Sequence, residues 1–451
     1  MNSPEAARAA AINACKLCNP LGASLVFRGI EGAVPLLHGS QGCATYIRRY
    51  IISHFKEPID IASSNFSETS TIFGGGQNLK KAIKNVAAQY KPSLIGIATT
   101  CLSETIGDDV QMILHEFKEE DTSQDKPVIV SVSTPSYQGS HIDGFHDTVR
   151  AVIAQMATGG PKTKMVAFFP GMVSTADLRL IKEIFADFEL ELLLLPDYSE
   201  TMDGVIWDSY SKISPGGAPI AKIQAAGRAK AAIQLGRTIS DYQNSALYLK
   251  EKFAVECFHL GLPLGIKETD LFMEKLSRIS GKEIPLKYRQ ERGRLVDSYV
   301  DAHKYLFGKK AVLYGEPDLV LGMAAFLAET GVIPVICATG TETGKLESEL
   351  KGLLPTFKSQ MTIVEGIDFT EIGSMVEREK PDFLIGNSKG YSLARKLDIP
   401  LIRVGFPIHD RIGGTRILHL GYRGAQQLFD RIVNILIEEK QENSPVGYSY
   451  M

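Results

Sequence analysis

The sequence predicts an α/β protein built from three doubly wound domains with parallel sheets. Two observations support this prediction: continuous apolar strand candidates recur along the chain, and amphipathic helical segments alternate with them across turns of small or polar residues. Continuously apolar strands are typical of parallel sheets that helices cover on both faces. At 451 residues the chain is also too long for one core, and two to four domains are expected.

The first unit of this kind opens with the apolar strand Ser93–Ala98. A turn over Thr99–Glu104 follows, then a helix over Ile106–Lys118 and a second strand over Pro127–Val132. In doubly wound folds, the loops at the carboxyl ends of the strands carry the ligands. The sequence therefore places Cys101, three residues after the first strand, in a position suited to binding.

The second unit runs from strand Lys164–Phe169 through helix Ser174–Phe188 to strand Leu190–Leu195. Ser174 is the expected N-cap of this helix, with Asp177 as an acidic partner in the first turn. Two further units repeat the pattern, and their expected elements are strand Ala311–Tyr314, helix Asp318–Thr330, strand Ile333–Ala338, strand Asp382–Ile385, helix Tyr391–Lys396 and strand Pro400–Val404.

Glycine-containing breaks divide the chain into the three expected domains. They lie near Thr158–Pro161 and Phe307–Lys309 and give domains at residues 1–160, 161–307 and 308–451. The middle domain contains a segment, Ala221–Glu291, that the pattern predicts to be strongly helical. The tail after Gln441 is polar and is expected on the surface or against a partner.

Composition excludes several classes of protein. Hydrophobic residues make up 44% and charged residues 22%, with a net charge of −3, so no basic surplus indicates a nucleic-acid binder. No apolar run reaches the roughly 18–20 residues that span a bilayer, and the first residues lack the pattern of a signal peptide. We expect a cytoplasmic protein, without a membrane or nucleic-acid partner, whose cysteines remain thiols.

The six cysteines are unevenly distributed, with four in the first quarter of the chain. Cys18, Cys43 and Cys101 each lie on a predicted loop beside small residues, which allow backbone amides to approach a bulky ligand. Thiolates together with free amides are what an iron–sulfur cluster requires. Cys15 and Cys18 form a close pair, but no second such pair supports a zinc site, so Cys15 is interpreted as spare.

Each cysteine could also be a small buried hydrophobic residue, which is the usual role of a free cysteine. The residues alone leave both interpretations open. If the three thiolates do bind a cluster, they fall short of the four ligands that a simple four-iron cluster needs. A cluster would then require a ligand from another chain or an oxygen ligand, which predicts a subunit interface.

The residues around these cysteines belong to a set of motifs that spans the chain. The motifs are Cys18–Ala23 (CNPLGA), His38–Cys43 (HGSQGC), Arg49–Pro58 (RYIISHFKEP), Phe73–Gly76 (FGGG), Thr99–Asp109 (TTCLSETIGDD), Ser133–His141 (STPSYQGSH) and Phe406–Gly424 (FPIHDRIGGTRILHLGYRG). In these motifs the chain resembles the beta-type subunit of the nitrogenase component 1 family and the related N-type subunit of its cofactor-assembly scaffold. The resemblance implies the fold of that family, with three Rossmann-like domains.

The resemblance also implies a site. In the beta-type family, the cysteines matching Cys18, Cys43 and Cys101 bind half of an [8Fe-7S] P-cluster, which is shared with a homologous alpha-type subunit in an α2β2 heterotetramer. Ser136 matches a serine that can ligate the oxidised cluster, although its sequence alone is typical of a turn hydroxyl. No catalytic residue is assigned, because the active cofactor of the family is held by the alpha-type chain.

Two aromatic residues match further positions of the family. Tyr46 matches a residue near the electron path between the two clusters. Phe73 matches the region where the ATP-dependent iron protein, the reductase of the system, docks. An aromatic residue before three glycines is a credible exposed anchor, but a core position fits the sequence equally well.

Two functions remain open at this point. Retention of all three cysteines favours the eight-iron cluster and hence a nitrogenase or nitrogenase-like reductase, a group that includes reductases of C–S bonds. The residues Phe27–Glu31 and the closing sequence GYSYM are similar both to divergent nitrogenase-like chains and to N-type scaffold chains, and the latter hold a [4Fe-4S] cluster and do not catalyse reduction. The segment Gly386–Gly390 matches the letters of a nucleophile elbow, but we interpret it as an ordinary strand-to-helix turn.

Overall fold

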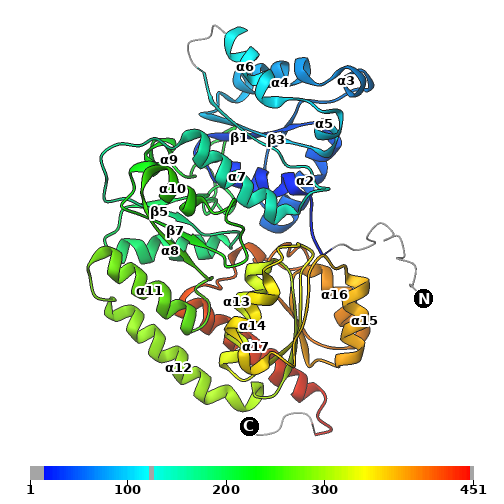
Figure 1. Ribbon diagram of the computed structural model, residues 1–451. Helices are drawn as coiled ribbons and strands as arrows, with labels where there is room; N and C mark the ends of the chain where they lie inside the picture. Colours follow the sequence, from blue (N-terminus) through cyan, green and yellow to red (C-terminus); the bar gives the residue numbers. More distant parts are fainter. Residues whose placement is uncertain (1–14, 121–125, 447–451) are drawn as a thin grey trace, which may run out of the picture.

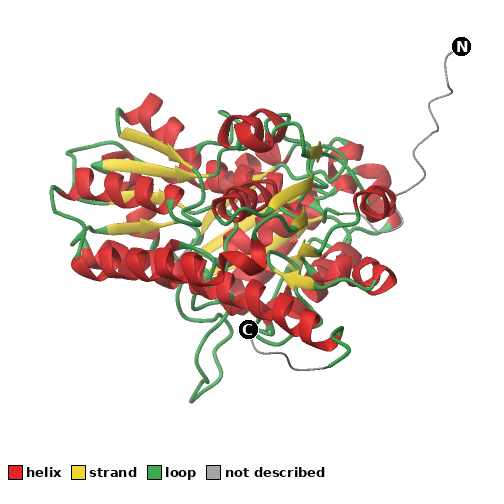
Figure 2. Cartoon of the chain, turned by 90° about the horizontal axis from the view of Figure 1, so that it is seen from below, coloured by secondary structure: helices red, strands yellow, loops and turns green. Residues whose placement is uncertain are grey.

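A computed structural model describes residues 15–120 and 126–446 of the chain. Within these residues the strands form three separate sheets, and every strand pair in them is parallel (Figure 1). Helices surround the strands, as Figure 2 shows from below. The α/β architecture predicted from the sequence is therefore confirmed. Among the described helices, none has both the length and the apolar character that crossing a membrane requires.

The first sheet carries the cysteine loops and has the strand order β2-β1-β3-β4. Its strands are β1 (Ala33–His38), β2 (Ala62–Ser63), β3 (Leu94–Thr99) and β4 (Val128–Val132). Its helices are α1 (Asn19–Arg28), α2 (Gln41–Phe55), α3 (Glu68–Phe73), α4 (Gly76–Tyr90), α5 (Cys101–Ile106), α6 (Val110–Glu120) and α7 (His141–Met156).

The second sheet has the order β6-β5-β7-β8. Its strands are β5 (Val166–Phe169), β6 (Leu192–Leu194), β7 (Ala231–Leu235) and β8 (Glu256–Leu260). The helices of this part of the chain are α8 (Thr175–Asp187), α9 (Ile220–Gln224), the 3-10 turn η1 (Ala225–Arg228), α10 (Ser245–Phe253), α11 (Lys267–Ser280) and α12 (Leu286–Leu306).

The third sheet has the order β11-β10-β9-β12-β13. Its strands are β9 (Lys310–Tyr314), β10 (Ile333–Ala338), β11 (Thr362–Val364), β12 (Phe383–Gly386) and β13 (Leu401–Arg403). The remaining elements are α13 (Pro317–Glu329), α14 (Leu346–Leu353), η2 (Pro355–Phe357), α15 (Phe369–Glu379), η3 (Ser388–Gly390), α16 (Tyr391–Leu397), η4 (Gly414–Arg416) and α17 (Gly421–Glu442). Helix α17 packs against α12.

One apolar core connects all three sheets. It contains Phe27 of α1, Phe168 of β5 and Leu313 of β9, each completely buried. The strands predicted from apolar runs are present, and Ser174 caps α8 as expected, accepting a hydrogen bond from Asp177 N at 3.0 Å. The domain limits at 160 and 307 stay a prediction.

Two sequence predictions were wrong. The segment Ala221–Glu291 is not uniformly helical, because it contains β7 and β8. The residues of β7, AAIQL, favour helices by propensity, but all five are buried between neighbouring strands, and this packing overrides the propensity. The turn expected over Thr99–Glu104 instead contains most of helix α5, which ends at Gly107 with a φ of 78°, and the helix expected from Ile106 begins only at Val110 as α6.

Helices α1 and α7 pack backbone against backbone. A Cβ atom built on Gly22 of α1 would lie 1.8 Å from the carbonyl oxygen of His141, and one built on Gly144 of α7 would lie 2.1 Å from the carbonyl oxygen of Asn19. All ten residues of α1 are buried. Only glycine permits this approach, which fixes the start of α1 against the start of α7.

The substitution Gly22→Ala should reduce the free energy of unfolding by about 1–3 kcal/mol, because the methyl group overlaps the backbone of α7. Gly293→Ala in α12 is the matched control: its Cβ would have no atom within 4 Å, so we expect a gain of about 0.5–1 kcal/mol from helix propensity. Denaturant unfolding measures both changes. Equal effects of the two substitutions would contradict the packing described here.

Candidate functional site

Cys43 and Cys101 lie at the carboxyl edge of the first sheet, where β1 and β3 run side by side. The last residues of these strands, His38 and Thr99, are paired in register. The chain leaves β1 toward β2 on one side and reaches β3 on the other, so this edge is a topological switch point, where doubly wound folds bind ligands. Cys43 is in the first turn of α2, and Cys101 is the first residue of α5.

Cys18 joins this region from a different direction, as the N-cap residue of α1. The loop around Ser136 connects it to Cys101. The Ser136 hydroxyl accepts a hydrogen bond from Asn19 N at 3.1 Å, and the Ser136 amide donates to Cys101 Sγ at 3.2 Å. The structure therefore brings together the segments of Cys18, Cys101 and Ser136, which are far apart in the sequence.

The three thiols are accessible and affect one another electrostatically. Cys43 and Cys101 are exposed, and Cys18 is half-buried. Partial burial and the negative charges of the Cys18 and Cys101 thiolates raise the pKa of Cys43. Each cysteine also lies at a helix N-terminus, whose partial positive charge favours thiolates and other anions. Three thiols in such a setting can bind a metal group.

The other cysteines are separated from this group. Cys15 is buried in the apolar cluster of the third sheet, where burial and the charge of Glu316 raise its pKa to about 12. Cys337 in β10 is completely buried, and burial raises its pKa to about 12 as well. Cys257 lies half-buried in β8. The interpretation of Cys15 as spare agrees with this placement.

Tyr46 lies close to the cysteines, one turn after Cys43 in α2. Its side chain is 45% exposed, and its ring centroid is 4.8 Å from that of Tyr50. Burial, a hydrogen bond with Tyr50 and the charge of Cys18 raise the pKa of Tyr46, so the phenol remains protonated. An aromatic pair thus stands beside the thiols.

Lys389 lies near Cys18 in the structure, which the sequence did not predict. Its Nζ lies 3.5 Å from the carbonyl oxygen of Lys16 and 6.0 Å from the Tyr50 ring centroid. Burial lowers the pKa of Lys389, and the charges of Cys15 and Cys18 oppose that shift. In the sequence, Lys389 is part of the turn Gly386–Gly390. Nothing in that turn indicates that the third sheet places a positively charged side chain near Cys18.

Phe73 is exposed and not part of the core. It ends α3 with 83% of its surface accessible, beside Ile72 at 74%. The glycine turn that follows is tied to the cysteine edge of the sheet: the Asp108 carboxylate accepts from Gly75 N at 3.0 Å and lies 3.0 Å from His38 Nε2. His38 is a completely buried residue whose two ring nitrogens are both within hydrogen-bond distance of partners, Ser64 and Asp108.

The nucleophile-elbow letters do not form a hydrolase site. The Ser388 hydroxyl bonds to Asp410, but Asp410 forms an ion pair with Arg403, and His419 is bonded to Asp177 instead. Among residues 15–120 and 126–446, no group of three or more His, Cys, Asp or Glu side chains is placed to hold a single metal ion.

Comparison with known proteins decides the family. The family model for nitrogenase component 1 type oxidoreductase matches residues 18–437. The chain belongs to the nitrogenase component 1 family. It is 36% identical over 435 residues to the nitrogenase molybdenum-iron protein beta chain of Clostridium pasteurianum, covering 96% of this chain and 94% of the relative. The corresponding beta chain of Methanothermobacter thermautotrophicus is 34% identical, with 98% of both chains covered.

Solved structures agree with this assignment. A chain of the structure described as nitrogenase Cp1 at pH 6.5 superimposes with a TM-score of 0.95 at 34% identity, covering 100% of this chain and 98% of that one. A second chain, from nitrogenase Cp1 at pH 5, has a TM-score of 0.69 at 16% identity and so shares the fold alone. The predicted resemblance is confirmed: this is a beta-type member of the nitrogenase component 1 family.

Thiol alkylation tests the arrangement of the cysteines. In metal-free protein at pH 8, iodoacetamide should modify the exposed Cys43 and Cys101 and leave Cys15 and Cys337 unmodified, because a buried thiol with a pKa of about 12 is only ~10⁻⁴ ionised. The Cys43 rate should continue to rise above pH 9, since its pKa is raised.

Peptide mass spectrometry measures the modification at each position, and protein unfolded in urea supplies the control in which all six cysteines react. Modification of native Cys15 as fast as Cys43 would contradict the placement.

Proposed function

We propose that the chain is the beta-type, electron-relay subunit of a nitrogenase or nitrogenase-like reductase of N2 or C–S substrates. In this proposal it pairs with an alpha-type chain in a cytoplasmic α2β2 heterotetramer and holds a P-cluster-type [8Fe-7S] cluster at their interface. The observation that carries the proposal is the accessible group of Cys18, Cys43 and Cys101 on three helix N-termini at one sheet edge.

The residues at this edge fit an iron–sulfur cluster. Cys18, Cys43 and Cys101 would supply the thiolates, and the Ser136 amide already donates to Cys101 Sγ at 3.2 Å, the kind of hydrogen bond that tunes cluster sulfur atoms. When bound, such a cluster accepts electrons one or more at a time and passes them on.

Ser136 has a second role in this proposal. Its hydroxyl accepts from Asn19 N at 3.1 Å and keeps a second lone pair with which it could ligate a cluster. Through this hydrogen bond it holds the first residue of α1, and therefore the neighbouring Cys18, in position. Lys389 places a positive charge near Cys18, which would stabilise a cluster that has gained an electron.

Exposure of Cys43 and Cys101 supports a partner at this edge. Three thiolates leave the cluster short of ligands, and thiols open to solvent would leave it unprotected. A homologous alpha-type chain would supply the remaining ligands and cover the edge, including the half-exposed Tyr46. The curated relatives are beta chains of molybdenum-iron proteins, which agrees with such a pairing.

Ile72 and Phe73 support a docking surface for the ATP-dependent iron protein. Two adjacent exposed apolar side chains are typical of an interaction site, and Phe73 is the aromatic anchor of this pair. The Asp108 contacts join the turn after Phe73 to the strand that precedes Cys43. The proposed surface is thus continuous with the proposed cluster edge.

The substitution Cys43→Ala should remove the interface cluster and loosen the subunit assembly, because a central thiolate is lost. The measurements are iron content and the EPR spectrum of the oxidised complex after anaerobic purification, together with its mass in solution. Cys257→Ala is the control, since that cysteine lies in β8 away from the group. Full iron content in the Cys43 variant would contradict the proposal.

The same wild-type measurement separates the relay from an N-type assembly scaffold. An eight-iron signature with substrate turnover supports the relay. A lone [4Fe-4S] signature without turnover would replace it with the scaffold.

The substitution Phe73→Ala should weaken binding of the iron protein about tenfold or more while leaving the iron content unchanged, because an exposed aromatic anchor is removed. Titration of the complex with iron protein, followed by electron transfer, measures the change. Tyr242→Ala is the control, since Tyr242 is 75% exposed but belongs to the loop before α10. Equal binding by the Phe73 variant and the wild type would rule out this docking site.

A further inference from the structure

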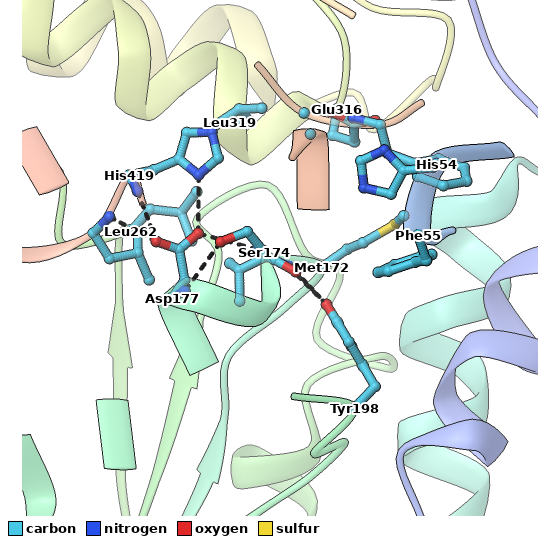
Figure 3. Close-up of a pocket in the computed structure, with 15 residues that line it drawn as sticks. His54, Phe55, Met172, Ser174, Asp177, Tyr198, Leu262, Glu316, Leu319 and His419 are labelled. Carbon is cyan, nitrogen blue, oxygen red and sulfur yellow. Dashed lines mark hydrogen bonds and ion pairs between the residues drawn. The ribbon is translucent and has the colours of Figure 1, made fainter. Parts of the chain in front are cut away.

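A small internal cavity lies where loops of the second and third sheets meet the end of α2 (Figure 3). Its volume is 40 Å³, which is room for about three water-sized groups. The loops after β5, β8, β9 and β13 contribute to it, so it adjoins the carboxyl edges of two parallel sheets. This is the position where doubly wound folds bind ligands.

The walls of the cavity are mostly apolar, with two carboxyl groups, two imidazoles and the Tyr198 phenol among them. Asp177, Glu316, His54 and His419 line it together with residues such as Phe55, Met172, Leu262 and Leu319. Among the fifteen described residues that line it, none is Lys or Arg. The cavity therefore contains two carboxyl groups and no permanently positive side chain.

Asp177 is fully satisfied by its neighbours. Its carboxylate accepts hydrogen bonds from His419 N at 2.7 Å, Leu420 N at 2.9 Å and His419 Nδ1 at 2.9 Å, and these contacts lower its pKa against the effect of burial. Because Nδ1 of His419 donates to Asp177, the lone pair of a neutral His419 is on Nε2. That atom has no hydrogen-bond partner among the described residues.

Only one of the two carboxyl oxygens of Glu316 has a hydrogen-bond partner among the described residues. Its Oε1 accepts from Phe406 N at 3.2 Å, but its Oε2 has no hydrogen-bond partner in the described part of the chain. Glu316 is 6% exposed and His419 is 5% exposed, so water outside the protein cannot compensate either atom. A buried acceptor without a donor is unfavourable by about 1–3 kcal/mol.

Two histidines lie near Glu316. His141 Nε2 is 3.6 Å from Glu316 Oε1, and because His141 Nδ1 accepts from Leu17 N, the ring carries its proton on Nε2. His54 Nδ1 accepts from Ile408 N at 2.9 Å, and burial lowers its pKa to about 3. His54 therefore supplies no positive charge to Glu316.

We propose that this cavity binds a small monovalent cation of the ammonium type that donates a hydrogen bond to Glu316 Oε2. The size of the cavity admits a water-sized ion and a water molecule beside it, and the unpartnered Oε2 matches a donor of such an ion. A divalent metal is disfavoured, because no three described His, Cys, Asp or Glu side chains are placed to chelate one.

Thermal unfolding of the purified complex tests the site. Ammonium chloride should raise the Tm by about 2 °C over tetramethylammonium chloride at equal concentration, because the larger cation cannot enter the cavity. Glu316→Gln should abolish this difference. Glu329→Gln should retain it, since Glu329 ends the same helix but accepts from Ile266 N and Lys267 N outside the cavity. No difference in the wild type, or an equal one in Glu316→Gln, would overturn the proposal.

A second measurement does not depend on the stability of a variant. Crystals of the wild-type complex soaked in thallium(I) acetate should give an anomalous peak within hydrogen-bond distance of Glu316 Oε2. Ordered water there without an anomalous signal would show that the cavity is hydrated but binds no cation.

Discussion

The close contact between α1 and α7 is the constraint on which the cysteine edge depends. Gly22 and Gly144 leave no room for a side chain between the two backbones, so the helices have one relative position. Cys18 caps the first of them, and the Ser136 loop leads into the second. Cys18 and the Ser136 loop are therefore positioned by completely buried, uncharged atoms. Close packing of buried helices thus fixes the position of side chains at the exposed edge.

Parallel sheets give this chain two functional edges that differ in character. At the first sheet, the switch point is open and presents thiols, an exposed tyrosine and helix N-termini. At the second and third sheets, the carboxyl edges face inward and enclose Glu316 and His419. The same topological rule produces an external surface suited to a partner chain and an internal space suited to a small ion. An external surface forms where the loops face solvent, and an internal space forms where the loops face other loops.

Much of this could be predicted from sequence, since apolar strand runs and small-residue loops are local signals. Ser174 and Asp177 formed the predicted cap because capping depends on neighbours within one turn. Strand β7 was missed because its alanines carry no strand preference and only tertiary burial selects the extended form. The surroundings of Lys389 and Glu316 could not be predicted from the sequence. Lys389 contacts Lys16 and Glu316 contacts Phe406, and both contacts join residues that are remote in the chain. The resemblance identified Ser136, but its hydrogen bond to Asn19 joins distant parts of the chain and is seen only in the structure.

Cys15 and Cys18 are three residues apart, yet they face different environments: the first thiol is sealed in the apolar cluster of the third sheet, while the second borders the open edge. Of the two thiols in this segment, only that of Cys18 is therefore available at the open edge. Any reagent or partner that approaches the open edge therefore meets only the Cys18 thiol of this segment, because residue 15 is committed to the core of the third sheet.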